Sequence, residues 1–338
     1  MEKDSTELVM VAILHRHGDR APINKYLYPN SPSKGNDFYP VGESNLTNVG
    51  KKQLYEVGKK LRQRYDSLLG PYFIGNELKV LTSTLERTQT SALTLCAGLF
   101  PPCDKQIWNK DLMWQPIPYT EIKERNDCVI RNPGGAFPIF VKLYDEILES
   151  DFNQQLLKRY RKELDFIKKH AGYENPTIRD AYFLYFSLEA ERNMGLPLPD
   201  WAKDIFPEKL EEIAVFEYDL STLTTPLKQY AAGGLAKVVT DLFTDKINNK
   251  TQLKCLIISG HECTIGFQLR LLGIEDRRVP KFSSHLIWEL HKTENNYEVK
   301  IFYQNFYEDD PVQCLNMPYE DFLSKMKPYI PTWKIIID

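Results

Sequence analysis

The chain has 338 residues, of which 42% are hydrophobic and 26% are charged, a composition typical of ordinary globular proteins rather than fibrous or disordered ones. Its formal net charge of -3, with Lys and Arg spread along the chain, argues against the basic stripe that a nucleic-acid backbone requires. No apolar run approaches the roughly 18 to 20 residues of a membrane-spanning helix, so we expect neither nucleic acid nor a membrane as a partner.

The first predicted element is the apolar run from Leu8 to Leu14. A short continuous apolar run of this kind is typical of a strand buried on both faces in a parallel or mixed sheet. The carboxyl end of this strand delivers the polar segment 15–22. Because the functional crevice of an open α/β sheet lies beyond the carboxyl ends of its strands, this segment is a candidate site.

The next elements continue the alternation of helix and strand. Thr47 is a candidate helix N-cap, and apolar residues at helical spacing follow until Gly70. A strand near Leu78 to Thr82 and a helix from about Leu85 to Gly98 come next. This order predicts an α/β fold.

The middle of the chain has a different pattern, with predicted helices at 137–149 and 152–170 that are rich in Lys, Glu and aromatic residues. We interpret 114–218 as a mainly helical cap inserted into a discontinuous α/β core of 1–113 and 219–338. Aromatic residues are concentrated in this cap, for example in 182–186. Most should pack in the core, while a minority should roof a cleft.

The second half of the core repeats the strand, loop and helix order. A strand at Cys255 to Ser259 runs into Gly260-His261-Glu262, and a helix follows near 265–272. Two strand ends thus carry histidines, and we expect both loops in one site. The segments 284–290 and 297–303 alternate like two antiparallel strands at a sheet edge. We therefore expect a mixed central sheet flanked by helices.

The chemistry is concentrated in the run Arg16-His17-Gly18-Asp19-Arg20-Ala21-Pro22. Two guanidinium groups beside one imidazole form a cradle for phosphate, whose charge of about -2 near neutral pH the arginine forks can neutralise. A neutral His17 could then attack phosphorus. Gly18 would allow close backbone approach, and Asp19 would either orient the imidazole or an arginine, or be a solvated turn residue.

This run resembles the Arg-His-Gly-x-Arg-x-Pro signature of the histidine acid phosphatases, the branch-two histidine phosphatase family. Further similar segments extend almost end to end: 37–40, 46–50, Ser83-Thr-x-x-Arg87-Thr, 98–102, 114–118 and Ser259-Gly-His261-Glu262. The chain looks most like the insect venom and salivary members. The resemblance implies the histidine phosphatase fold with an inserted helical cap.

The same resemblance implies a role for six residues. His17 would form a phosphohistidine, while Arg16, Arg20, Arg87 and His261 would bind the phosphate. Glu262 would protonate the leaving alkoxide, in a reaction without metal or other cofactor. Many relatives have Asp at this position, and a Glu262 that is protonated at mildly acidic pH would fit acid-phosphatase behaviour. The remaining histidines are structural by default.

Localisation rests on weaker signals. Residues 1–4 lack the basic and apolar run of a signal peptide, which fits a cytosolic protein or a mature secreted chain. Six cysteines allow one to three disulfides, for instance Cys96 with Cys103, whereas Cys255 and Cys263 could be free buried thiols. The sequons at Asn45 and Asn249, the cysteines and the resemblance together favour secretion. The resemblance also implies a possible homodimer.

The leading hypothesis is hydrolysis of small phosphomonoesters through phosphohistidine. The alternative is a secreted, weakly catalytic or non-catalytic protein of the same fold that binds biogenic amines or lipid mediators in the cleft, because fold alone does not prove turnover. The retention of all six matched residues favours the enzyme. A phosphoglycerate mutase is a weaker third hypothesis, since that branch lacks the long helical cap.

Overall fold

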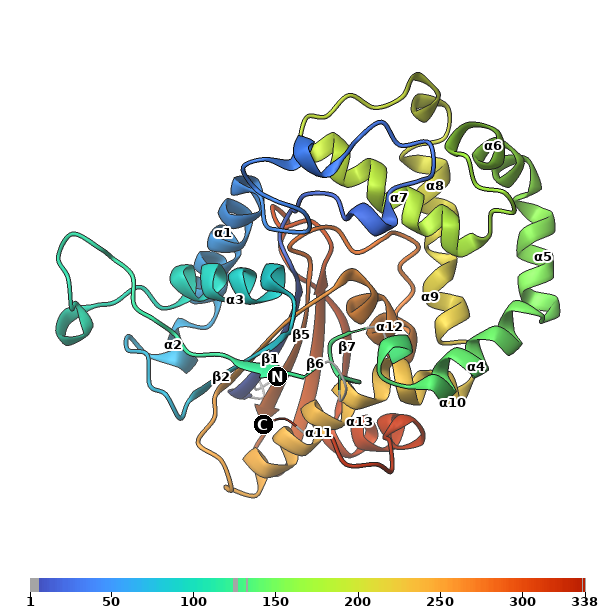
Figure 1. Cartoon of the computed structure of the whole chain (residues 1–338). Helices are drawn as coiled ribbons and strands as arrows, with labels where there is room; N and C mark the ends of the chain where they lie inside the picture. The colour runs from blue at the N-terminus through green and yellow to red at the C-terminus, as the bar shows by residue number, and fades with distance from the viewer. Residues whose placement is uncertain (1–5, 124–126, 132, 336, 338) are drawn as a thin grey trace.

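The computed structural model describes residues 6–123, 127–131, 133–335 and 337. The described residues form one mixed seven-stranded sheet with the order β3-β2-β4-β1-β5-β6-β7, with helices on both of its faces (Figure 1). The strands are β1 (Glu7–Arg16), β2 (Leu78–Ser83), β3 (Thr120–Ile122), β4 (Cys255–Gly260), β5 (His285–Lys292), β6 (Tyr297–Gln304) and β7 (Val312–Pro318). The predicted α/β class with a mixed central sheet is confirmed.

Strand β1 lies where the sheet changes from parallel to antiparallel. It runs parallel to β4, with Arg16 opposite Gly260, and antiparallel to β5. Strands β2 and β3 run parallel to β1 and β4, so the carboxyl ends of β1, β2 and β4 share one edge. The predicted antiparallel strands are present as β5 and β6, but they are not at the edge of the sheet. The edge strand is β7, whose sequence lacks a clear apolar alternation.

The two faces of β1 pack against different helices, because successive strand residues point to opposite faces. Val11 and Ile13 belong to one hydrophobic core with residues of α1 (Asn48–Arg64) and α3 (Glu86–Leu99). Met10, Ala12 and Leu14 belong to a second core, which includes residues of α11 (Gly234–Ile247) and α12 (Glu262–Leu272). Burial on both sides thus explains the apolar run from Met10 to Leu14 within β1.

Two of the predicted helices are each divided in two at a single tyrosine. Thr47 caps α1 as predicted, accepting a hydrogen bond from the Gly50 amide, but the helix ends at Arg64 and α2 (Asp66–Leu69) follows. The predicted helix 152–170 is likewise divided at Tyr160 into α5 (Asp151–Arg159) and α6 (Arg161–Ala171). At both junctions the tyrosine leaves helical backbone angles while its ring is buried.

The middle of the chain supplies the helices on the right-hand side of Figure 1. They include α4 (Pro138–Leu148), α7 (Ile178–Asn193), α8 (Glu208–Ala214) and α9 (Phe216–Ser221), and the chain returns to the core helices through α10 (Thr225–Lys228). The range 114–218 also contains β3, which pairs with β2 in the sheet. The C-terminal helix α13 (Tyr319–Met326) packs beside α11.

The predicted disulfide is not confirmed. All six cysteines lie in the described part of the chain, and all six are free thiols there. Cys96 belongs to α3 and is buried in the core, whereas Cys103 is partly exposed and its thiol donates to the Pro71 carbonyl. Cys255 and Cys263 are buried, as expected for free thiols. None of the described helices is both long enough and apolar enough to span a membrane.

Candidate active site

A cavity of about 420 Å³ opens beyond the carboxyl ends of β1 and β4. Five of the six predicted site residues line it: His17, Arg20, Arg87, His261 and Glu262. The first two follow β1, Arg87 lies in the first turn of α3, and the last two join β4 to α12. The structure therefore brings together residues that are up to 245 positions apart, as the predicted parallel strand order requires.

The His17 imidazole is 1% exposed and has a fixed tautomer. Its Nδ1 lies 2.9 Å from the Gly18 carbonyl oxygen. Because a carbonyl can only accept, Nδ1 carries the proton and Nε2 keeps its electron pair in a neutral ring. Burial lowers the pKa of His17 well below its ordinary value, and Arg87 and Arg16 lower it further. This imidazole therefore stays unprotonated at mildly acidic pH, as a nucleophile must.

Arg20 and Arg87 crowd the same cavity with positive charge. Arg20 donates to the Ala21 carbonyl at 2.9 Å, and Arg87 donates to the Ser44 hydroxyl at 2.5 Å. The Nε atoms of both guanidinium groups are buried without a hydrogen-bond partner among the described residues. Burial and then Arg20 lower the pKa of Arg87 to about 9. Two cations held this close favour a bound anion.

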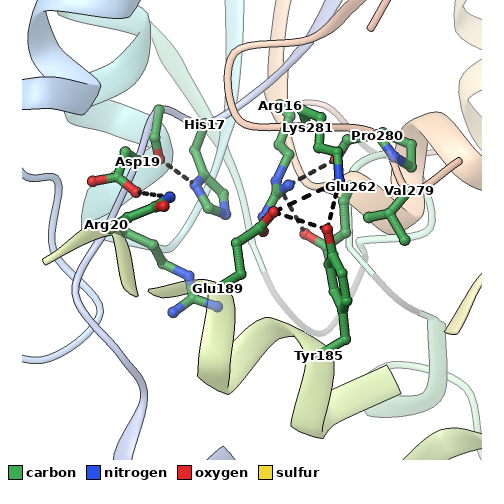
Figure 2. Close-up of polar contacts among 12 residues, drawn as sticks. Arg16, His17, Asp19, Arg20, Tyr185, Glu189, Glu262, Val279, Pro280 and Lys281 are labelled. Atoms are coloured by element: carbon green, nitrogen blue, oxygen red, sulfur yellow. Dashed lines mark hydrogen bonds and ion pairs between the residues drawn. The ribbon is translucent and has the colours of Figure 1, made fainter. Parts of the chain in front are cut away.

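Arg16 is not among the residues that line the cavity, and it lies between His17 and Glu262 in Figure 2. Its guanidinium is fully buried, donates to the Pro280 carbonyl at 2.7 Å and lies 3.7 Å from the centre of the Phe282 ring. Its Nη2 is 3.6 Å from the Glu189 carboxylate, and its Nε is 3.7 Å from that of Glu262. The Arg16 guanidinium is thus held by two carboxylates and a carbonyl, and the prediction that it clamps phosphate stays a prediction.

His261 and Glu262 begin α12, with the ring of His261 5.6 Å from that of His17. The Nε2 of His261 lies 3.3 Å from the Ser83 hydroxyl at the end of β2. Burial lowers the pKa of His261 well below its ordinary value, and Arg87 adds to the effect. His261 is therefore a neutral hydrogen-bonding group in the empty site.

Glu262 is ionised in the empty site. Burial raises its pKa, but the nearby Arg16 and a hydrogen bond from Tyr182 outweigh burial and lower the pKa to about 2. The prediction of a carboxyl that is protonated at mildly acidic pH is therefore wrong for the unliganded protein. The physical reason is the excess of positive charge around it, which the sequence does not place in space.

The loop that carries His17 is pressed against the start of α1. A Cβ added to Gly18 would lie 2.5 Å from the Gly50 carbonyl oxygen, and one added to Gly50 would lie 2.2 Å from that of Asp19. Asp19 is fully buried and accepts hydrogen bonds from Thr47 at 2.6 Å and from Asn193 at 2.8 Å. Asp19 therefore anchors the loop. It is not solvated, and its hydrogen bonds go to neither the imidazole nor an arginine.

One stripe of α7 supports the site and was not predicted. The stripe consists of residues at helical spacing, Tyr182, Phe186, Glu189 and Asn193. Tyr182 contacts Glu262, Phe186 and Glu189 both contact Arg16, and Asn193 contacts Asp19. Lys281 joins this group by donating to Tyr185 at 2.5 Å while it lies 3.9 Å from Glu189 (Figure 2). The spacing was the available signal, but it resembles ordinary core packing.

Aromatic side chains form much of the remaining wall. Tyr26 stacks on Phe183 with a centroid distance of 4.5 Å and an interplanar angle of 7°, and both line the cavity together with Phe140, Tyr144, Tyr182 and Phe186. The cap thus contributes apolar surface opposite the charged strand ends. Among the described residues, no group of three or more His, Cys, Asp or Glu side chains is arranged to hold a metal ion.

Comparisons with known proteins agree with this geometry. Residues 7–304 match the histidine phosphatase superfamily (branch 2). The chain is 35% identical to the venom acid phosphatase of Apis mellifera, over 88% of this chain and 77% of that protein. It is 31% identical to the lysosomal acid phosphatase of Xenopus laevis, over 96% and 77%. The structure of Hafnia alvei phytase in complex with tartrate has the same fold, with a TM-score of 0.72 at 15% identity over 98% of both chains. The chain therefore belongs to branch 2 of the histidine phosphatase superfamily.

Proposed function

We propose that this protein is an acid phosphatase that hydrolyses phosphomonoesters through a phosphohistidine on His17. The observation that carries the proposal is the neutral, buried imidazole of His17, held by Gly18 in one tautomer within reach of two cavity-lining arginines. The match to branch 2 and the acid phosphatase names of the relatives support the enzyme over the amine-binding or lipid-binding alternative.

The reaction has two steps. In the first, Nε2 of His17 bonds to phosphorus while the bond between phosphorus and the leaving oxygen breaks, and Glu262 gives that oxygen a proton. In the second, water attacks phosphorus while the Glu262 carboxylate takes a proton from this water, the bond to Nε2 breaks and phosphate leaves. Arg20, Arg87 and His261 would donate hydrogen bonds to the phosphoryl oxygens throughout. Arg16, which does not line the cavity, would contribute its charge from beside Glu262.

Substrate binding would reverse the electrostatics at Glu262. The empty site has an excess of positive charge, which holds the pKa of this carboxyl at about 2. A bound phosphomonoester brings about two negative charges, which neutralise the arginines and repel the carboxylate. Both effects raise the pKa of Glu262. The proton that the leaving group needs would therefore be taken up together with the substrate at mildly acidic pH.

The cavity suits a small phosphomonoester. Its volume of about 420 Å³ is at the small end of ligand sites. Away from the strand ends, where the phosphate would bind, its wall combines aromatic side chains with the charged residues Lys25, Arg131, Arg179 and Glu217. We therefore propose a leaving group with both apolar and polar parts.

The test is hydrolysis of p-nitrophenyl phosphate between pH 4 and 8 in the presence of a chelator, with His17→Ala as the control. We expect turnover at acidic pH that the variant lacks. Rapid quenching should also trap a phosphorylated protein in the wild type alone. Equal rates for wild type and folded His17→Ala would contradict the proposal.

We also propose that the protein is secreted. The sequon residue Asn249 is exposed, and Asn45 is partly exposed. One relative is a venom protein and another a lysosomal one, and both destinations lie on the secretory route. Secretion from a eukaryotic host should yield a glycosylated chain, whose mobility changes after glycosidase treatment and in an Asn249→Gln variant. A chain that stays unmodified in the cytosol of its natural cells would overturn the proposal.

A further inference from the structure

The carboxylate of Glu262 has a second anchor besides Arg16. The hydroxyl of Tyr182, on α7, donates a hydrogen bond of 2.6 Å to Oε1 of Glu262. Arg16 faces the other oxygen, Oε2, at 3.7 Å. The two carboxyl oxygens are therefore distinguished by their partners, one a short hydrogen bond and the other a longer ion pair.

Tyr182 is well suited to fix a position. Its ring is held edge-on by Phe186 at 4.8 Å and by Tyr218 at 5.9 Å, and the residue is 7% exposed. A packed tyrosine places its hydroxyl with few rotatable bonds, whereas a glutamate side chain has one more than an aspartate. A glutamate at this position gains reach but loses precision. The hydrogen bond from Tyr182 restores that precision.

We propose that Tyr182 is a positioning residue that holds Oε1 of Glu262, so that Oε2 is the oxygen that delivers the proton to the leaving group. This inference rests on the proposed phosphatase reaction. The Tyr182 hydroxyl donates its own proton to Oε1, so the carboxyl proton resides on Oε2. As the bond from phosphorus to the leaving oxygen breaks, this proton moves from Oε2 to that oxygen. The resulting carboxylate keeps the hydrogen bond from Tyr182, which stabilises its charge.

The other charged and titratable groups around Glu262 act through space or through longer contacts. They are Arg16, Arg20, Arg87, His261, Tyr218 and Cys263. All of them would remain after a Tyr182→Phe substitution, which removes one hydroxyl and keeps the ring. The matched control is Tyr218→Phe, because the hydroxyl of Tyr218 is buried next to Tyr182 without a hydrogen-bond partner among the described residues.

The experiment compares kcat/KM for two leaving groups, because this constant reports the step in which the leaving group departs. The poor leaving group of an alkyl phosphate such as glycerol 2-phosphate needs its proton, whereas p-nitrophenolate needs it little. We expect Tyr182→Phe to lower kcat/KM for the alkyl ester about 10- to 100-fold, a part of what general acid catalysis contributes, and to change the value for p-nitrophenyl phosphate less than about 3-fold. The basic limb of the pH profile of kcat for the alkyl ester, which reports groups in the enzyme–substrate complex, should move to higher pH, since the lost hydrogen bond favoured the ionised carboxyl. Tyr218→Phe should match the wild type.

A second variant separates positioning from a general loss of structure. In Glu262→Asp the carboxyl is one methylene shorter and falls short of the Tyr182 hydroxyl. Adding Tyr182→Phe to Glu262→Asp should therefore change kcat/KM for the alkyl ester less than about 3-fold. Equal losses on both esters, or the same loss in the Glu262→Asp background, would overturn the inference. A wild type that hydrolyses neither ester would instead refute the proposed phosphatase activity.

Discussion

The strand ends and helix α7 contribute different kinds of groups to the site. Beyond β1 and β4, the arginines crowd around two neutral histidines, and burial together with neighbouring arginines lowers the pKa of Arg20 and of Arg87. Helix α7 supplies to the same place a carboxylate, a phenol and an amide, from Glu189, Tyr182 and Asn193. The strand ends hold charges that repel each other in the absence of phosphate, and α7 provides the groups that offset this repulsion.

The comparison indicates that the groups proposed for the reaction and the groups that stabilise the site lie on different elements. The arginines that we propose as phosphate ligands repel one another, a cost that preorganised sites commonly carry. Glu189 and Asn193 of α7 do not line the cavity and instead contact Arg16 and Asp19. Substitutions in the two regions should therefore separate, with activity lost first at the strand ends and stability lost first along α7.

The largest separation is expected for Arg20→Ala. Removing this guanidinium should lower kcat/KM for p-nitrophenyl phosphate by about 10³-fold, the scale for one preorganised donor to a developing charge. The free energy of unfolding, measured by urea denaturation without phosphate, should stay equal or rise, because a repelling charge is gone. A clear fall in the free energy of unfolding would contradict the expected separation between activity at the strand ends and stability along α7.

Glu189→Gln, on α7, should lower the free energy of unfolding more strongly than it lowers kcat/KM. The Glu189 carboxylate is buried and lies between Arg16 and Lys281. Leaving these cations less compensated should lower the free energy of unfolding by about 3 kcal/mol.

The control for Glu189→Gln is Glu212→Gln. Glu212 pairs with Lys209 at the surface, where its side chain is 40% exposed. This change should cost at most about 1 kcal/mol. Equal denaturation midpoints for the two variants would argue against a stabilising role for α7.

The third prediction concerns pH. Burial lowers the pKa of both His15 and His285 to about 4. Between pH 6.5 and 5 these residues are protonated in the unfolded chain but not in the folded one, so each lowers stability by about 1.4 kcal/mol per pH unit on acidification. A His285→Gln variant should reduce the measured slope by that amount. An unchanged slope would show that His285 takes up its proton in the folded state.

The smallest effect is expected for Asn193→Ala. Asn193 donates to the buried Asp19 carboxylate, which keeps its second hydrogen bond from Thr47. Losing one such bond should lower the free energy of unfolding by about 1 kcal/mol, with a smaller relative loss of activity than in Arg20→Ala. If Asn193→Ala reduced turnover as strongly as Arg20→Ala, the loop position rather than the charge would be the limiting factor.

The sequence predicted the strand ends well because their signals are local. An apolar run followed by a dense polar motif identifies both a strand and the residues at its end, as at β1 and β4. Helix α7 could not be interpreted in this way, because most of its residues are buried and its supporting stripe is hidden among core positions. The ionisation of Glu262 depends on Arg16 and Tyr182, which only the folded chain brings close to it.

The contact between Gly18 and Gly50 limits how this sequence can evolve. Each glycine lies against backbone atoms that cannot move away without shifting the His17 loop from the start of α1. Neither position can compensate for a larger residue at the other, because both already lack a side chain. A side chain at either position therefore requires a backbone shift between the His17 loop and α1, and side chains at both positions require a larger one. Selection at these two sites acts on a single backbone contact rather than on two separate amino acids.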